Sequence, residues 1–293
     1  MTPLREEVER AGWALVRAAD VGGDLAREAS VSPWTAAERL FGERAEMVER
    51  QPIRAIPGGR SFASSDVYTP LHTDSQPYLG APPSLQVMIC VRPAAEGGET
   101  ILADGWEITR RAHRDDPDLA RCLYEEPRRI SFYFGDVVGA TIARWRGHIA
   151  FTHAPVATRG DALGPRVRAL VDRARRIELR PGVGDVLVVD NHRMLHGRRA
   201  FVDRAGQGSR EFVRLLVWLA QPFAVDETIS TRARDATNAA PSPSPLDDTT
   251  AAHRLAVVTE LLRGAAPGML SVREQISEAE LYRWRDAALG GSA

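Results

Sequence analysis

The 293-residue sequence lacks several residue types on which common chemistries depend. It contains no lysine, so its 38 basic residues are all arginines, and neither Schiff-base nor P-loop chemistry is open to it. Its two cysteines, Cys90 and Cys122, form no CxxC pattern, which argues against a disulfide framework and against a zinc knuckle. Aromatic residues make up only 6% of the chain.

Long apolar runs and an excess of charge are also missing. No run reaches the length of a membrane span, and the N-terminal residues MTPLREEVERAGWALV lack the apolar centre of a signal peptide. The formal charge is -1, so there is no electrostatic footprint for nucleic acid or for an anionic membrane surface. We expect a cytoplasmic protein whose partner is a small-molecule substrate, and the sequence leaves homo-oligomerisation open.

The order of patterns along the chain predicts a mainly β core with flanking helices. Apolar residues from Leu4 to Val16 have near-helical spacing, and a second helix is expected from about Thr35 to Met47. Helices are also predicted at 106–125 and 164–175. Short β-rich runs separated by Gly and Pro lie at 85–91, 99–104, 129–134, 148–153, 185–190 and 211–220. This pattern predicts an α+β fold of the double-stranded β-helix, or jelly-roll, type.

We interpret residues 1–293 as a single domain with a core at about 53–220, a helical N-terminal flank at 1–50 and a C-terminal helical extension at 223–293. The extension contains a Pro/Ser-rich stretch at 238–248, followed by predicted helices at about 250–263 and 277–289. We expect it to cover an active-site mouth or an oligomer interface. A helical tail packed on the outer sheet for stability is the alternative.

Two histidines and one aspartate form the pattern that carries chemistry. In YTPLHTDSQP, His72 and Asp74 are two residues apart, so on an extended chain both side chains leave by the same face. Much later, a glycine turn and an apolar strand precede His196. Two imidazoles and one carboxylate on a triangular face are typical of non-haem Fe(II) sites, in which positions stay open for a cosubstrate and oxygen.

The ordered segments LHTDSQPYLGAPPSLQVMICV, EGGETILADGW and VVDNHRMLHGRRAF resemble the taurine dioxygenase-like (TauD/TfdA) Fe(II)/2-oxoglutarate oxygenases. Within that family the γ-butyrobetaine and trimethyllysine hydroxylase branch is the most similar, over roughly residues 53–220. The resemblance implies that His72, Asp74 and His196 are the iron ligands and catalytic residues. It also implies that Thr100 helps to hold 2-oxoglutarate, and that Fe(II), 2-oxoglutarate and O2 are required.

By the same resemblance, an arginine beyond His196 would bind the distal carboxylate of 2-oxoglutarate. Arg210 and Arg214 compete for this role. We favour Arg210, because the family places the first arginine of an R-x-x-x-R pair on the cosubstrate and a guanidinium can grip a carboxylate with two hydrogen bonds. Arg214 shares the same strand face by alternation and would either bind a substrate anion or form a plain salt bridge.

The expected reaction is hydroxylation of an unactivated C-H bond in a small amino-acid-like or natural-product substrate, with release of succinate and CO2. Betaine substrates fit poorly, because no cysteine of an N-terminal zinc module precedes Cys90 and few aromatics are available for a trimethylammonium cage. Asp74 argues against a halogenase, whose site replaces the carboxylate. Desaturation or cyclisation stays open, and a non-catalytic or zinc-binding jelly roll is a weaker alternative.

The remaining histidines are interpreted as structural. His192 lies four residues before His196, His148 and His153 flank a predicted strand, and His113 and His253 lie in predicted helices without a partner pattern.

Overall fold

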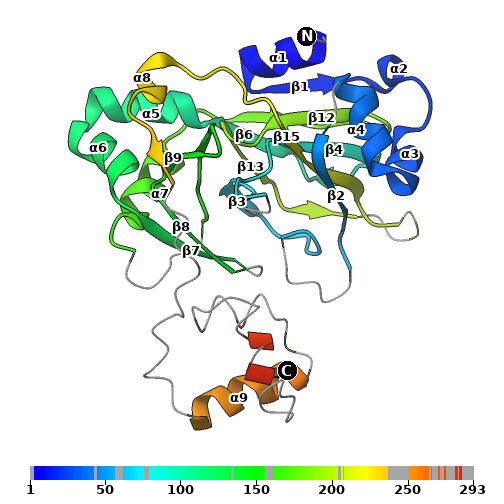
Figure 1. Cartoon of the computed structure of the whole chain (residues 1–293). Coiled ribbons are helices and arrows are strands. Elements are labelled where there is room, and N and C mark those ends of the chain that lie inside the picture. Colours follow the sequence, from blue (N-terminus) through cyan, green and yellow to red (C-terminus); the bar gives the residue numbers. More distant parts are fainter. Residues whose placement is uncertain are drawn as a thin grey trace.

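The computed structural model describes residues 3–42, 45–56, 62–75, 79–132, 135–155, 161–203, 206, 208–236, 251–263 and isolated residues between 265 and 285. Its main body contains antiparallel β-sheets with helices on both outer sides (Figure 1). No helix of this described part is both long enough and apolar enough to cross a membrane.

Two sheets form the centre of the body. The five-stranded sheet has the order β1 (Trp13–Val16), β12 (Val186–Asp190), β4 (Leu85–Arg92), β15 (Glu211–Leu219) and β2 (Ala45–Arg54). The four-stranded sheet has the order β11 (Ile177–Leu179), β6 (Thr100–Asp104), β13 (Met194–Arg198) and β3 (Thr69–His72). All neighbours within both sheets are antiparallel.

Alternation along the strands separates an inner from an outer face of each sheet. In β4, Val87 and Ile89 pack outward against helices, whereas Met88 and Cys90 pack inward. The inner cluster joins both sheets and consists of Ile53, Met88, Cys90, Leu102, Leu187, Val189, Met194 and Phe212. The two sheets therefore share an apolar core, and polar side chains on their inner faces are placed opposite one another.

Helices cover the outer faces. The five-stranded sheet packs against α1 (Pro3–Ala11), α3 (Leu25–Val31) and α4 (Pro33–Phe41), with the short α2 (Ala18–Val21) between them. The four-stranded sheet packs against α5 (Gly105–Asp115), α6 (Pro117–Glu125) and α7 (Gly164–Asp172). The Asp104 and Asp116 side chains cap the N-termini of α5 and α6, which fixes where these two helices begin.

Smaller elements complete the body. These are the pairs β7 (Arg128–Phe132) with β8 (Gly135–Gly139) and β5 (Glu96–Gly97) with β14 (Phe201–Val202), the sheet of β9 (Ile142–Trp145), β10 (His148–Phe151) and β16 (Arg234–Asp235), and the helix α8 (Glu227–Ser230). Phe223, Ile229 and Ala233 pack into the two outer clusters. Helix α9 (Ala251–Leu262) packs instead with Leu270, Leu281 and Trp284.

The predicted α+β class and every strand predicted from residue 85 onward are confirmed, but the helical N-terminal flank was partly wrong. Residues 13–16 form the strand β1, because Gly12 adopts a φ of +82° that ends α1. The second predicted helix ends at Phe41, where Gly42 is left-handed, and residues 45–47 begin β2. Residues 133–134, the stretch at 238–248 and most of 277–289 lie outside the described residues.

Candidate active site

His72 and Asp74 are held by backbone contacts at the end of β3. The Nδ1 atom of His72 lies 2.9 Å from the Pro70 carbonyl oxygen, so a neutral ring donates its Nδ1 proton there and leaves the Nε2 lone pair available. The Asn191 side chain brackets the Asp74 backbone. Its Oδ1 accepts from the Asp74 N-H at 2.9 Å, and its Nδ2 donates to the Asp74 carbonyl at 2.7 Å.

His196 reaches the same place from β13, where it is paired directly with His72. The two imidazole centroids are 4.3 Å apart and the rings are inclined by 53°. Gly197 permits this close pairing, because a Cβ atom there would lie 2.6 Å from the Thr69 carbonyl oxygen on β3. The glycine of the HGR motif is therefore explained by strand packing.

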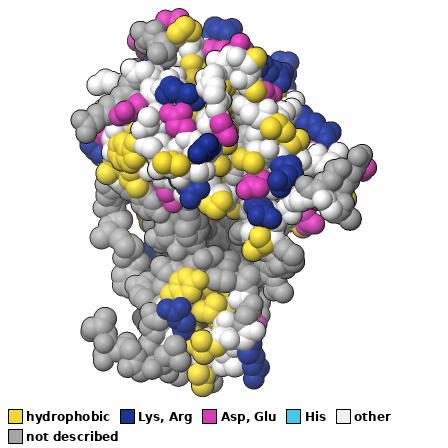
Figure 2. Space-filling model, turned by 90° about the vertical axis from the view of Figure 1, so that its right-hand side faces the viewer, with side chains coloured by type: hydrophobic (Ala, Val, Ile, Leu, Met, Phe, Trp, Pro, Cys, Tyr) yellow, Lys and Arg dark blue, Asp and Glu magenta, His cyan; other side chains and the backbone are white. Residues whose placement is uncertain are grey.

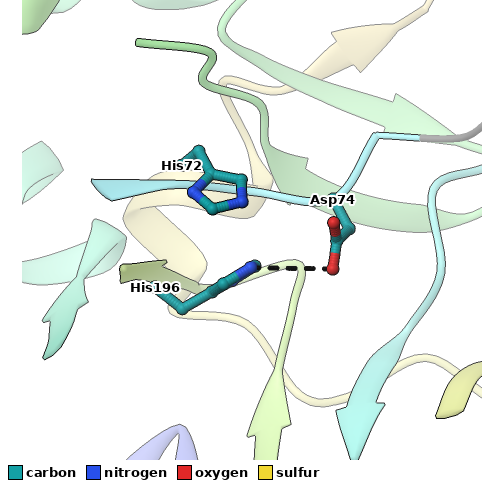
Figure 3. Close-up of side chains that lie close together, drawn as sticks. All are labelled: His72, Asp74 and His196. Atoms are coloured by element: carbon teal, nitrogen blue, oxygen red, sulfur yellow. Dashed lines mark ion pairs between the residues drawn. The ribbon is translucent and has the colours of Figure 1, made fainter. Parts of the chain in front are cut away.

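The donor atoms of His72, Asp74 and His196 lie within 4.8 Å of one another, and the side chains converge on one point (Figure 3). Burial lowers the pKa of His72, and it lowers the pKa of His196 to about 3, so both rings are neutral at physiological pH. Burial alone would raise the pKa of Asp74, but Arg214 and the two histidines bring it down to about 2. The His196 Nε2 atom lies 3.6 Å from Asp74 Oδ2, so this contact is between a neutral ring and a carboxylate.

This donor set fits a divalent metal ion. Two neutral imidazoles and one ionised carboxylate are the protonation states that metal binding requires. The Gln86 amide nitrogen lies 2.8 Å from both the Asp74 Oδ2 and the His196 Nε2, so a metal bound through these atoms would displace that amide. In the part of the chain that the structure describes, no other three His, Cys, Asp or Glu side chains are grouped in this way.

Arg214 lies on the inner face of β15 and contacts Asp74. Its Nη1 is 3.2 Å from Oδ1 and 3.3 Å from Oδ2, and its Nη2 contacts the Gln51 side-chain oxygen. Of the two roles predicted for Arg214, the structure thus displays the salt bridge. The guanidinium neutralises the Asp74 charge and orients that carboxylate.

Arg210 is buried, with 3% of its surface exposed, and its guanidinium lies 4.1 Å from the Phe212 ring centroid and 5.6 Å from that of Phe201. Among the described residues, its side chain has no hydrogen bond or ion pair. Burial lowers the pKa of Arg210 to about 10, with the nearby Arg198 adding repulsion, so the side chain remains charged at neutral pH. A buried cation without a carboxylate partner is suited to an anionic ligand.

Thr100 lies in the same region. It is buried on β6 and is paired with Arg198 on β13, two residues along from His196 on the same face. Gly98 brings the GGET segment close to Arg210, because a Cβ atom there would lie 3.3 Å from the Arg210 Nε. Thr100 therefore lies about 7 Å along the strand direction from the level of His196. Arg210, beside Gly98, lies at the same end of the inner space.

Sequence reasoning missed three supporting residues: Gln86, Asn191 and Arg198. Gln86 was detectable as the one polar residue in the apolar run LQVMICV, and Asn191 lies inside the DNHRMLHGR segment already singled out. Arg198 donates to the carbonyl oxygens of residues 62, 65 and 67, and so fastens the segment before β3. The histidines interpreted as structural lie outside the cluster; His192, for example, contacts the Pro82 carbonyl.

Comparison with known proteins agrees with this geometry. The chain matches the Taurine catabolism dioxygenase TauD, TfdA family over residues 4–171. It is 26% identical over 208 residues to mitochondrial trimethyllysine dioxygenase of Gallus gallus, an alignment that covers 59% of this chain and 48% of that protein. The chain thus spans about half the length of this relative.

Two solved structures share the fold. Asparagine oxygenase in complex with Fe(II), 2S,3S-3-hydroxyasparagine and succinate has a TM-score of 0.51 at 14% identity, covering 74% of this chain and 78% of that one. The non-heme iron oxygenase OrfP in complex with (3S)-hydroxy-L-Arg has a TM-score of 0.52 at 18% identity, with the same coverages.

The fold and the donor set are those of the class of non-haem Fe(II)/2-oxoglutarate dioxygenases. The chain belongs to the TauD/TfdA family, as its motifs predicted, and Fe(II) and 2-oxoglutarate are the cofactors of this class. His196, Arg210 and Arg214 lie beyond the residues matched to the family, so their roles rest on their positions in the structure.

Proposed function

We propose that the protein is a dioxygenase with a double-stranded β-helix core that hydroxylates an unactivated C-H bond of a small amino-acid-like or natural-product substrate. 2-Oxoglutarate would be converted to succinate and CO2. The observation that carries the proposal is the convergence of His72, Asp74 and His196 on an inner face that also holds Arg210, a buried cation without an anionic partner among the described residues. The asparagine and arginine derivatives bound to the structural relatives support an amino-acid-like substrate.

In this proposal the chain's own residues position the reactants. His72, Asp74 and His196 would hold Fe(II), which supplies the chemistry that couples 2-oxoglutarate oxidation to O2 activation. Arg210 and Thr100 would bind the distal carboxylate of 2-oxoglutarate, while Arg214 keeps Asp74 ionised and oriented. The apolar core around Met88, Cys90 and Phe212 would exclude water from the reacting atoms.

The test is anaerobic absorption spectroscopy of the protein with Fe(II) and 2-oxoglutarate, followed by aerobic turnover. We expect a weak visible charge-transfer band, then succinate release and a product heavier by one oxygen atom. His196→Ala should abolish the band and turnover, whereas His192→Gln, a change at a neighbouring buried histidine, should retain both. Turnover at a near-normal rate in His196→Ala would contradict the ligand assignment.

Product mass separates the alternatives that use the same ligands. Desaturation or cyclisation would remove two hydrogen atoms from the substrate and add no oxygen. A zinc-binding or non-catalytic protein would give neither the charge-transfer band nor succinate.

A further inference from the structure

The inner face of β2 carries two polar side chains next to the candidate active site. Val48 packs outward against the helices and Ile53 packs inward between the sheets. By alternation, Glu49 and Gln51 face inward with Ile53. Strand pairing places Gln51 beside Arg214 on β15.

A continuous chain of polar contacts leads from Glu49 to the candidate iron ligand. The Gln51 side-chain amide donates to Glu49 Oε1 at 2.6 Å, and the Gln51 oxygen accepts from the Arg214 guanidinium. Arg214 in turn donates to Asp74. These contacts orient the side chains of Gln51 and Arg214, and the hydrogen bond from Gln51 fixes the orientation of the Glu49 carboxylate on the inner face of β2.

The second oxygen of the Glu49 carboxylate has no hydrogen-bond partner in the described part of the chain. Its Oε2 is enclosed and accepts no hydrogen bond from any residue that the structure describes. Asp74 is neutralised by Arg214, and the charge of Arg210 is assigned above to 2-oxoglutarate, whereas Glu49 forms no ion pair with the described residues. An enclosed carboxylate oxygen without a donor is costly, so this position favours a ligand that brings both an N-H group and a positive charge.

We propose that Glu49 is a specificity-determining residue that binds a protonated amino group of the substrate. This inference rests on the proposed function and narrows its substrate class to small molecules with a primary ammonium or a similar N-H-bearing cation. A quaternary ammonium has no N-H donor and would leave the Glu49 oxygen unsatisfied. Gln51 and Arg214 connect this contact to Asp74.

The experiment compares free and Nα-acetylated forms of the common L-amino acids. Each is titrated anaerobically into the protein with Fe(II) and 2-oxoglutarate, and the perturbation of the visible band gives a dissociation constant; succinate release gives KM and kcat. We expect free amino acids to bind more tightly than their acetylated forms, on the order of 10-fold to 100-fold. Glu49→Gln should remove this preference mainly through KM, and Glu49→Asp should restore part of it.

Glu46→Gln is the matched control, because Glu46 is an exposed residue of the same strand whose ion pair is with Arg146 at the surface. It should keep the wild-type preference, and thermal unfolding together with the visible band shows that each variant is folded. The proposal is overturned if no free amino acid perturbs the wild-type spectrum, if acetylated forms bind equally well, or if Glu49→Gln keeps the preference. Absence of the band in the wild-type protein would instead contradict the proposed function itself.

Discussion

At the scale of single residues, Arg214 on β15 and Arg210, which directly precedes that strand, have different electrostatic roles. Arg210 is buried without an anion among the described residues, whereas Arg214 is already paired with Asp74. The two arginines are four residues apart, so in an extended segment their side chains face the same side of the sheet. They lie at different ends of the inner space. This division leads to opposite expectations for the two alanine variants.

Arg210→Ala should raise the apparent constant for 2-oxoglutarate strongly, because removal of one partner of a desolvated charge pair costs on the order of 2 to 5 kcal/mol. Arg214→Ala should weaken Fe(II) binding instead, since it releases Asp74. Steady-state kinetics with varied 2-oxoglutarate and an Fe(II) titration distinguish the two effects. An unchanged constant in Arg210→Ala together with a large rise in Arg214→Ala would reverse the assignment.

Buried histidines away from the metal centre make stability depend on pH. Burial lowers the pKa of His192 to about 4, with a contribution from His148, and lowers that of His153 to about 3. Below about pH 6.5 the unfolded chain binds protons that the native protein does not, so stability is lost as pH falls from there to the folded pKa values.

The metal-free protein should therefore unfold more easily in urea at about pH 5 than at about pH 7. His192→Gln removes one of the groups that take up a proton on unfolding. It should therefore reduce the slope of the unfolding free energy against pH by up to about 1.4 kcal/mol per pH unit between the folded and unfolded pKa values. Glutamine can still donate to the Pro82 carbonyl that His192 contacts. Equal slopes for the variant and the wild-type protein would show that His192 is not responsible.

At the scale of secondary structure, the close pairing of β13 with β3 sets the distance between the two candidate histidine ligands. Gly197→Ala places a Cβ atom 2.6 Å from the Thr69 carbonyl, so the strands must separate. We expect a loss of on the order of 1 to 3 kcal/mol in unfolding free energy and weaker Fe(II) binding. Gly182→Ala is the control, because its nearest contact would be 3.5 Å, and normal iron affinity in Gly197→Ala would count against this role.

The sequence predicted most core elements because their signals are local. The apolar runs of β4, β12 and β15 and the helix α7 have clear periodicity. The region 106–125 was predicted as one helix, whereas the structure divides it at Asp116 into α5 and α6. The strands β1 and β2 were missed because their identity depends on distant partners: β1 pairs with β12, and β2 with β15. Motifs indicated the ligands, but the roles of Gln86, Gln51 and Glu49 arise from side-chain contacts that no local pattern specifies.

At the scale of the whole molecule, the C-terminal extension has two different parts. Residues 223–236 belong to the body, where Ile229 and Ala233 pack on the four-stranded sheet side and Arg234 pairs along β9. Helix α9 belongs to a separate cluster and exposes Leu255 and Leu262. In Figure 2 the coloured side chains of this lower part include hydrophobic groups beside arginines.

Truncation after Ala236 should therefore leave the thermal midpoint nearly unchanged, whereas truncation after Gln221 should lower it. The shorter protein loses Phe223 and Ile229, and each buried side chain of this size contributes about 1.5 to 3 kcal/mol. Our proposal that the distal part covers the active-site mouth or an oligomer interface is tested on the 1–236 protein. Consumption of 2-oxoglutarate without substrate hydroxylation would support a lid, and full coupled activity would exclude one.

The pairing of β1 with β12 and of β2 with β15 has a consequence for how the molecule is made. The first segments to leave the ribosome find their strand partners only after residues 186–219 have been synthesised. His72 likewise meets His196 only when β13 docks beside β3. Such long-range closure slows folding, because its chain entropy is lost before the contacts form. In the proposed function, the three ligands would therefore come together to hold iron only after His196 has been synthesised and β13 has docked beside β3.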